Sequence, residues 1–208
     1  MPKWLDNAVF YEIYPQSFLD TNADGIGDFQ GIINKLDYIR GLGCNALWIN
    51  PCFLSPFGDA GYDVADYYRV APRYGTNEDL KRLFAEAHKR EIHVLLDLVP
   101  GHTSVEHEWF RESMKAERNA YTDRYVWTDS VWEAPENMGC LRGISQRDGS
   151  CAINFFTCQP ALNYGYYNRT RPWQQSPDDE GPKATLNAMV GVMRFWLGLG
   201  CDGFRVDM

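Results

Sequence analysis

Residues 200–208 read GCDGFRVDM, and this stretch decides how the rest of the chain is interpreted. Its apolar residues alternate with charged ones, and successive side chains of a strand point to opposite faces. Arg205 and Asp207 therefore share one face of a short predicted strand. A guanidinium two positions before a carboxylate predicts an ion pair held by the backbone. Such a pair on its own is more often a structural salt bridge than part of an active site.

Apolar runs alternate with amphipathic segments upstream of this strand. The runs predicted as strands are residues 8–13, Ala46–Ile49 and 92–99. The predicted helices are residues 29–42, a segment capped by Thr76, and residues 183–199, whose predicted buried face carries Leu186, Met189, Val190, Met193 and Trp196. Strands that alternate with helices of this length predict an α/β fold with parallel strands.

The alternation fails between residues 104 and 179. Residues 106–115 favour a helix, but the remainder consists of short β-like pieces among Gly, Pro and Asn. A connection this long inside a compact fold predicts a small inserted subdomain.

The composition excludes some classes of partner. The net charge of the 208 residues is −8 with no basic stripe, which disfavours nucleic acid, and no apolar run is long enough to span a membrane. The 30 aromatic residues (7 Trp, 12 Tyr and 11 Phe) suit stacking on sugar rings. The six cysteines show neither CxxC nor zinc spacing, and the amino terminus lacks an apolar signal segment. We therefore expect reduced thiols and a cytoplasmic protein.

Residues 20–28, DTNADGIGD, place oxygen donors at nearly every second position of a glycine-containing loop. The candidate ligands are the side chains of Asp20, Asn22, Asp24 and Asp28 and the carbonyl oxygen of Ile26. Several hard oxygen ligands in a tight loop predict a calcium site. An EF-hand is excluded because its twelfth position, which needs glutamate, falls on Gly31. The alternative is a polar turn without a metal.

DGFRVDM resembles the nucleophile strand of the α-amylase family of glycoside hydrolases. The resemblance implies that Asp207 attacks the anomeric carbon and that Arg205 orients it. It implies the amino-terminal half of a (β/α)8 TIM barrel, with a small subdomain inserted after the third strand. Its parts are residues 1–103, the insertion 104–179, and residues 180–208 with the third barrel helix and the fourth strand. The family's general acid and third carboxylate lie on later strands, so we expect a fragment without the complete catalytic set.

Three other motifs strengthen the resemblance. DLVPGH, residues 97–102, is similar to a family motif in which the residue at Asp97 braces Arg205 and the one at His102 bonds the sugar. Tyr62 and Asp63 match a pair that stacks on the same sugar and bonds its outer hydroxyls. The loop 20–28 resembles the metal loop of the oligo-glucosidase branch. Without the resemblance, Asp97 and His102 read equally well as satisfied core groups, and Tyr62-Asp63 reads as a turn.

Two departures from the family pattern affect a second metal site. Many amylases bind calcium through an Asn and an Asp at positions that correspond here to Gly101 and Ala161. Neither residue offers a side-chain oxygen, so we expect calcium in the loop 20–28 and not at this second place.

The combined motifs predict a retaining α-glycosidase that acts on an α-linked oligosaccharide or glucan. The Asp63 match and the bulky Met208 after the nucleophile favour short substrates. One alternative is a transglycosylase or isomerase of the same family, which shares these motifs and differs in the sugar acceptor. The other is a non-catalytic homologue used for binding, in which loss of the nucleophile would be the usual sign.

Overall fold

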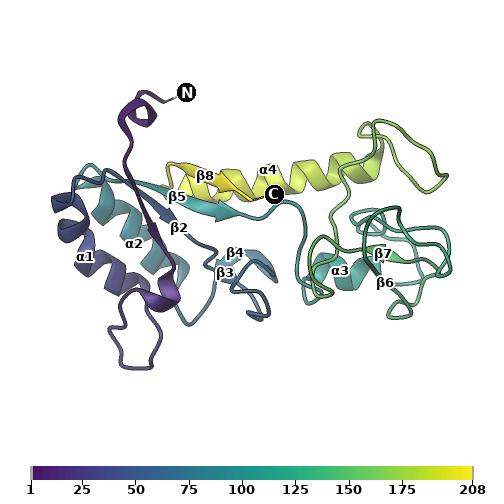
Figure 1. Ribbon diagram of the computed structural model, residues 1–208, viewed down its shortest axis with the longest axis horizontal. Helices are drawn as coiled ribbons and strands as arrows, with labels where there is room; N and C mark the ends of the chain where they lie inside the picture. The colour runs from purple at the N-terminus through teal and green to yellow at the C-terminus, as the bar shows by residue number, and fades with distance from the viewer. Residues whose placement is uncertain (1, 208) are drawn as a thin grey trace. The chain divides into compact units, whose positions relative to one another are not determined.

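The computed structural model describes residues 2–207, which divide into two compact units (Figure 1). The first unit contains the chain up to Leu54, Tyr67–Leu98 and Met193–Asp207. The second contains Ser55–Asp66 and Val99–Val192. The predicted insertion, residues 104–179, falls within the second unit.

A four-stranded parallel sheet forms the centre of the first unit. Its strands, in spatial order, are β1 (Phe10–Ile13), β2 (Ala46–Ile49), β5 (His93–Leu98) and β8 (Gly203–Val206). Spatial order follows chain order, as expected when each strand is followed by a crossover helix. The predicted parallel α/β architecture is confirmed, although β1 is two residues shorter than predicted.

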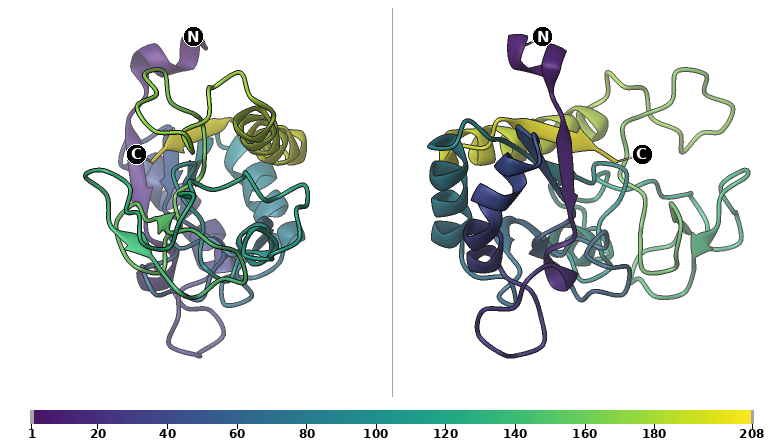
Figure 2. Two further views of the ribbon diagram at one scale, coloured as in Figure 1. Left: turned by 90° about the vertical axis from the view of Figure 1, so that its right-hand side faces the viewer. Right: turned by 60° about the vertical axis from the view of Figure 1, so that its left-hand side comes forward.

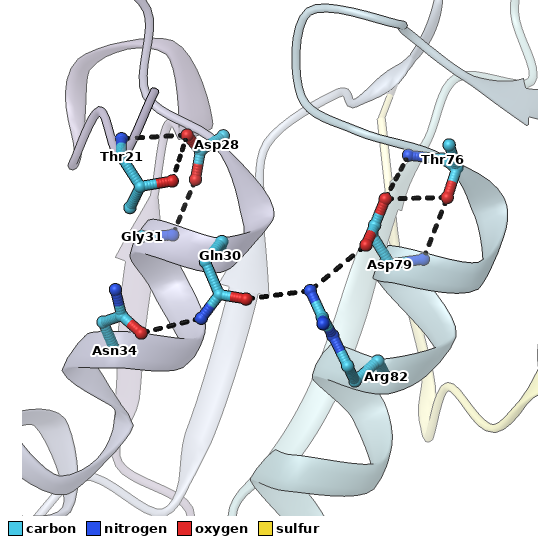
Figure 3. Close-up of polar contacts among 8 residues, drawn as sticks. All are labelled: Thr21, Asp28, Gln30, Gly31, Asn34, Thr76, Asp79 and Arg82. Atoms are coloured by element: carbon cyan, nitrogen blue, oxygen red, sulfur yellow. Dashed lines mark hydrogen bonds and ion pairs between the residues drawn. The ribbon is translucent and has the colours of Figure 1, made fainter. Parts of the chain in front are cut away.

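Helix α1 (Phe29–Gly41) covers part of this sheet. Asp28 caps it by accepting a 2.7 Å hydrogen bond from the amide of Gly31 (Figure 3). Such a cap satisfies one of the free amides at a helix start. The apolar side chains that α1 buries recur at helical spacing: Phe29, Ile32, Leu36 and Ile39.

Helix α2 (Asn77–His88) lies beside α1 on the same side of the sheet (Figure 2). It begins with a capping box, in which the Thr76 hydroxyl accepts from the amide of Asp79 and the Asp79 carboxylate accepts from the amide of Thr76. Nη2 of Arg82 donates a 2.8 Å hydrogen bond to Gln30 of α1 (Figure 3). The starts of the two helices are thus tied together at the end of the sheet where the strands finish.

Two features of the first unit were not predicted. A short 3-10 helix, η1 (Lys3–Asn7), stacks Trp4 on His93 with ring centroids 4.1 Å apart. The strands β3 (Phe53–Leu54) and β4 (Asp66–Val70) pair in a separate small sheet. Neither segment has the periodicity of a longer element, so the sequence pattern gives them little signal.

The second unit has little regular structure. It contains α3 (Glu108–Ser113) and an antiparallel pair, β6 (Cys140–Leu141) and β7 (Cys151–Ala152). One cluster of its buried residues, Val126, Ala152 and Ala161, packs against Tyr166 and Trp173. The predicted helix at 106–115 is present but shorter, because it begins after His107, whose side-chain Nδ1 caps it by accepting a 3.0 Å hydrogen bond from the amide of Trp109.

Helix α4 (Glu180–Leu199) begins in the second unit and ends in the first. The prediction that Leu186 is buried is wrong, because this side chain is 54% exposed. Thr185, Val192 and Trp196 are instead fully buried, and Trp196 donates a 2.8 Å hydrogen bond to the carbonyl of Tyr67. The buried face of α4 thus runs along Thr185, Met189, Val192 and Trp196, and Leu186 lies to the side of it.

All six cysteines are free thiols. Of the helices in residues 2–207, none combines the length and the apolar character needed to cross a lipid bilayer.

Candidate active site

Asp97 and Arg205 occupy paired positions of two neighbouring parallel strands. β5 and β8 pair so that Asp97 lies opposite Arg205. Nη1 of Arg205 lies 3.3 and 3.4 Å from the two carboxylate oxygens of Asp97, which is only 1% exposed. Strand register thus brings together two site residues that the sequence separates by 108 positions.

Arg205 also pairs with Asp207 on its own strand, on the shared face that the alternation predicts. The amide of Asp207 donates a 2.8 Å hydrogen bond to the carbonyl of Leu98, which extends the β5–β8 pairing past the last residue of β8. Asp207 is therefore held at the carboxyl end of the sheet. In parallel barrels this end carries the active site.

Trp48 of β2 is a third member of this cluster, and sequence reasoning missed it. Its Nε1–H donates a 2.9 Å hydrogen bond to Oδ2 of Asp97. Cζ of Arg205 lies 4.9 Å from the centroid of the Trp48 ring, within the range of a cation–π interaction. Period-two alternation places Trp48 on one face of its strand, but the contact also depends on the β2–β5 register, which the sequence alone does not give.

Burial raises the pKa of Asp97 to about 6, against the lowering effects of the Trp48 hydrogen bond and the charge of Arg205. Partial burial lowers the pKa of Arg205, but the carboxylates of Asp97 and Asp207 outweigh this effect and raise it. At neutral pH the cluster therefore holds an ionised Asp97 beside a permanent cation. Below about pH 6 protonation of Asp97 weakens that pair.

Asp63, in the second unit, is completely buried. Its carboxylate accepts hydrogen bonds from the hydroxyl of Ser55 at 2.8 Å, the amide of Gly58 at 2.8 Å and the amide of Asp59 at 3.1 Å. These donors satisfy the buried carboxyl oxygens and hold the preceding loop close to them. The predicted contact of Asp63 with sugar hydroxyls stays a prediction.

His102 lies beside Tyr62 in the same unit and is 1% exposed. Its Nε2 is 3.2 Å from the carbonyl oxygen of Tyr62, and its Nδ1 is 3.1 Å from the side-chain nitrogen of Asn154. A carbonyl accepts and an amide nitrogen donates, so a neutral ring with its proton on Nε2 fits both partners. The structure thus brings the predicted sugar-binding residues Tyr62, Asp63 and His102 together within one unit.

Asn154 and Phe155 are further residues of this region that sequence reasoning missed. The Phe155 ring meets His102 edge-on, with centroids 5.9 Å apart, and is 60% exposed. The sequence marks residues 151–156 only as a β-like piece. The contact between the exposed Phe155 ring and the buried His102 joins segments that are far apart in the sequence, so the sequence pattern does not reveal it.

The predicted calcium ligands lie along one loop before α1. Asp20 accepts from the amides of Asn22, Ala23 and Gly25, and the Gly25 hydrogen bond is the largest cause of its lowered pKa. Asp24 accepts from the amide of Ile26 and from the side chain of Asn22.

Asp28 closes this loop while capping α1. One of its oxygens accepts from the amide and hydroxyl of Thr21, and the other from Gly31 (Figure 3). In residues 2–207 no three His, Cys, Asp or Glu side chains are grouped as ligands of one metal ion. The donor set is nevertheless composed of the hard oxygens that calcium prefers. The calcium site stays a prediction.

The comparison with known families decides the assignment. The family model described as the α-amylase catalytic domain matches residues 12–208, nearly the whole chain. The chain belongs to the α-amylase family of glycoside hydrolases.

Three relatives within this family have different activities in their names. The trehalose synthase/amylase of Mycolicibacterium smegmatis is 41% identical over 98% of this chain and 33% of its own length. The oligo-1,6-glucosidase of Heyndrickxia coagulans is 40% identical over 100% of this chain and 36% of its own. The isomaltulose synthase of Protaminobacter rubrum has a solved structure with a TM-score of 0.85, 39% identity and coverage of 100% of this chain and 36% of that one.

This family membership confirms the predicted fold, the amino-terminal half of a (β/α)8 barrel. The 208 residues span about a third of the length of the curated relatives they match. The α-amylase-family motifs around Asp97 and Asp207 thus lie on the third and fourth barrel strands. Met208, which we expected to line a neighbouring sugar subsite, lies outside the described residues.

Proposed function

We propose that the full-length protein is a retaining α-glycosidase that acts on short α-linked glucosides, with Asp207 as its nucleophile. The observation that carries this proposal is the pairing of Arg205 with both Asp97 and Asp207 at the carboxyl end of the sheet. The buried carboxylate of Asp97 holds the guanidinium of Arg205 in place, and Arg205 in turn holds the carboxylate of Asp207 at the end of the strand.

The reaction would proceed by double displacement. A carboxylate oxygen of Asp207 attacks the anomeric carbon, the bond to the leaving oxygen breaks, and a covalent glycosyl-enzyme forms. A second carboxylic acid gives its proton to the leaving oxygen and then takes one from the water that releases the sugar. Retaining enzymes hold the two carboxyl groups about 5–5.5 Å apart. We assign this second group to no residue of the 208, so the 208 residues alone should be inactive.

The second unit would supply the contacts to the sugar. In this proposal the Tyr62 ring stacks on a sugar of the substrate, and Asp63 and His102 hydrogen-bond its hydroxyls. The support for these roles is the match of Tyr62-Asp63 and of DLVPGH to the family motifs; in the structure Asp63 and His102 are 0% and 1% exposed. Binding of a terminal hydroxyl by Asp63 favours attack at the ends of short chains.

Transfer of the sugar to another sugar is the second candidate function. It is favoured by the relatives, whose names include a trehalose synthase/amylase and an isomaltulose synthase beside an oligo-1,6-glucosidase. Hydrolysis and transfer share the glycosyl-enzyme and differ in whether water or a sugar hydroxyl attacks it. Product analysis separates them: the full-length protein is incubated with maltose, isomaltose, sucrose or trehalose. Conversion to monosaccharides alone indicates hydrolysis, and new disaccharides or trisaccharides indicate transfer, which also releases a monosaccharide from these donors.

The nucleophile is tested by covalent labelling of the full-length protein. A fluoroglycoside that traps the intermediate should label Asp207, and Asp207→Asn should lose several powers of ten in kcat while substrate still binds. Asp202→Asn, which lies just before the other end of β8, is the control and should keep kcat. A label on another carboxylate would reject the assignment. Absence of both label and turnover in the wild type would favour the non-catalytic alternative.

We also propose that the loop of Asp20, Asn22, Asp24, Ile26 and Asp28 binds one calcium ion. The ion would neutralise three carboxylates and fix the loop that leads into α1. No reaction step is assigned to it. The six free thiols support a reducing compartment such as the cytoplasm as the place of action.

A further inference from the structure

Trp48 contacts two of the three charged groups in the cluster of Asp97, Arg205 and Asp207. Its indole N–H donates to Asp97 at 2.9 Å, whereas Arg205 lies 3.3 and 3.4 Å from the same carboxylate. The indole hydrogen bond is thus shorter than either contact of Asp97 with Arg205. Its ring also faces the guanidinium, with Cζ 4.9 Å from the centroid.

Each of the three strands contributes a different group: β2 a neutral donor, β5 a buried carboxylate and β8 a cation. Asp97 is 1% exposed, so its charge depends on donors from the protein. An indole N–H stabilises a carboxylate without adding a positive charge. Asp97 therefore keeps one oxygen on a neutral donor of β2, which leaves the guanidinium of β8 able to pair with Asp207 as well. The face of the indole limits the positions that the guanidinium plane can take.

We propose that Trp48 is a positioning residue of the glycosidase reaction, acting on Asp207 through Asp97 and Arg205. This inference rests on the proposed role of Asp207 as nucleophile. Trp48 itself touches no reacting atom. Its hydrogen bond keeps Asp97 ionised and oriented, Asp97 holds Arg205, and Arg205 holds the attacking carboxylate.

A pH dependence distinguishes this role from simple packing. Burial raises the pKa of Asp97 to about 6, and the Trp48 hydrogen bond opposes that rise. The other titratable or charged groups that face Asp97 are Arg205 and Asp207 from β8 and the Cys52 thiol from the segment after β2. Loss of the indole donor should raise the pKa of Asp97 further, so the arginine loses its ionised partner at a higher pH. Loss of packing alone would leave that pH unchanged.

The test is Trp48→Phe in the full-length protein, which keeps an aromatic face and removes the donor. We expect kcat/KM at pH 7 to fall about 10-fold or more, and the acid limb of its pH profile to move up by about 0.5–1 pH unit. Trp196→Phe is the matched control, since it also removes a buried indole hydrogen bond from this unit but away from Asp97. It should lower stability and leave the acid limb in place.

A second measurement applies even if Trp48→Phe does not fold. With 15N-labelled tryptophan, one indole resonance of the wild-type protein should titrate with the midpoint of the acid limb, and it should stop titrating in Asp97→Asn. The proposal is overturned if no resonance behaves in this way, or if folded Trp48→Phe keeps both kcat/KM and the acid limb. An active Asp207→Asn would instead reject the proposed function itself.

Discussion

A single nitrogen of Arg205, Nη1, contacts carboxylate oxygens of both Asp97 and Asp207. One of these partners lies on the neighbouring strand and the other on the arginine's own strand. Strand register places Arg205 beside Asp97, and the flat guanidinium lies over the ring of Trp48. This arrangement makes the identity of the cation as important as its charge.

Arg205→Lys should lower kcat by about 10- to 100-fold with little change in folding, because an ammonium group keeps the charge but lacks the flat guanidinium that lies over the Trp48 ring. Steady-state kinetics of the full-length protein measure this effect. Arg90→Lys is the control, since Arg90 pairs with Asp37 and Glu86 on the outer surfaces of α1 and α2. Wild-type kcat in Arg205→Lys would show that charge alone suffices.

Asp97→Asn should change how stability depends on pH. Asp97 has a pKa of about 6 in the folded protein and an ordinary value of 3.8. The folded state thus binds the Asp97 proton more tightly than the unfolded state does. The stability that this protonation contributes is fully present below the unfolded-state pKa, and it is lost as the pH rises through the folded-state pKa. Relative to Asp97→Asn, the wild-type free energy of unfolding should fall by up to about 3 kcal/mol between pH 4 and pH 7. Urea unfolding at several pH values measures the difference. A constant difference would contradict the buried, ionised Asp97.

Asp202→Asn should show the opposite pH dependence. Burial opposes ionisation of Asp202, but contacts with His93, the Val94 amide and His88 outweigh it and lower its pKa. Its stabilising effect is present above the unfolded pKa and lost as pH falls through the lower, folded value.

At pH 7 the Asp202→Asn protein should be about 1–2 kcal/mol less stable, and the loss should shrink as the pH falls below about 4. Its kcat should stay unchanged, because Asp202 precedes β8 at the amino end of the sheet. Asp37→Asn is the control for removal of one carboxylate, because Asp37 of α1 forms an exposed ion pair with Arg90. A lower kcat in Asp202→Asn at constant stability would contradict a purely structural role.

Calcium should bind the full-length protein at the loop 20–28 and raise its melting temperature. Asp20→Ala should weaken this binding, and Asp6→Ala, which removes an exposed carboxylate outside the loop, should not. Asp28 is both a predicted ligand and the cap of α1, so removal of calcium by a chelator should weaken the start of this helix and lower the melting temperature. Calorimetry and thermal unfolding measure the two effects. Equal affinity in Asp20→Ala and the wild type would exclude the loop.

Much of the fold was predictable because local patterns and the final structure agree. β2 has the bounds that its apolar run predicts, and Thr76 caps α2 as expected. Asp97, Arg205 and Asp207 were found because alternation and motif order place them at the carboxyl ends of adjacent strands. Such features depend on sequence neighbours within a few positions.

Features that depend on contacts between distant segments were not predictable. Trp48 joins the cluster through the β2–β5 register, and Phe155 becomes notable only beside His102. Leu186 continues the apolar stripe of α4 and is nevertheless exposed. The polar Thr185 beside it is fully buried instead, because burial follows the face that meets neighbouring segments and not side-chain polarity alone.

The separation of Asp97 from Arg205 has a consequence for the order in which the chain is made. Asp97 leaves the ribosome 108 residues before Arg205, an interval of roughly 5–20 s at ordinary rates of synthesis. Trp48 is already present, 49 residues earlier. The nascent chain can therefore form the neutral hydrogen bond to Asp97 well before its cation exists. The indole of Trp48 would then be the first partner of the Asp97 carboxylate, before Arg205 is synthesised.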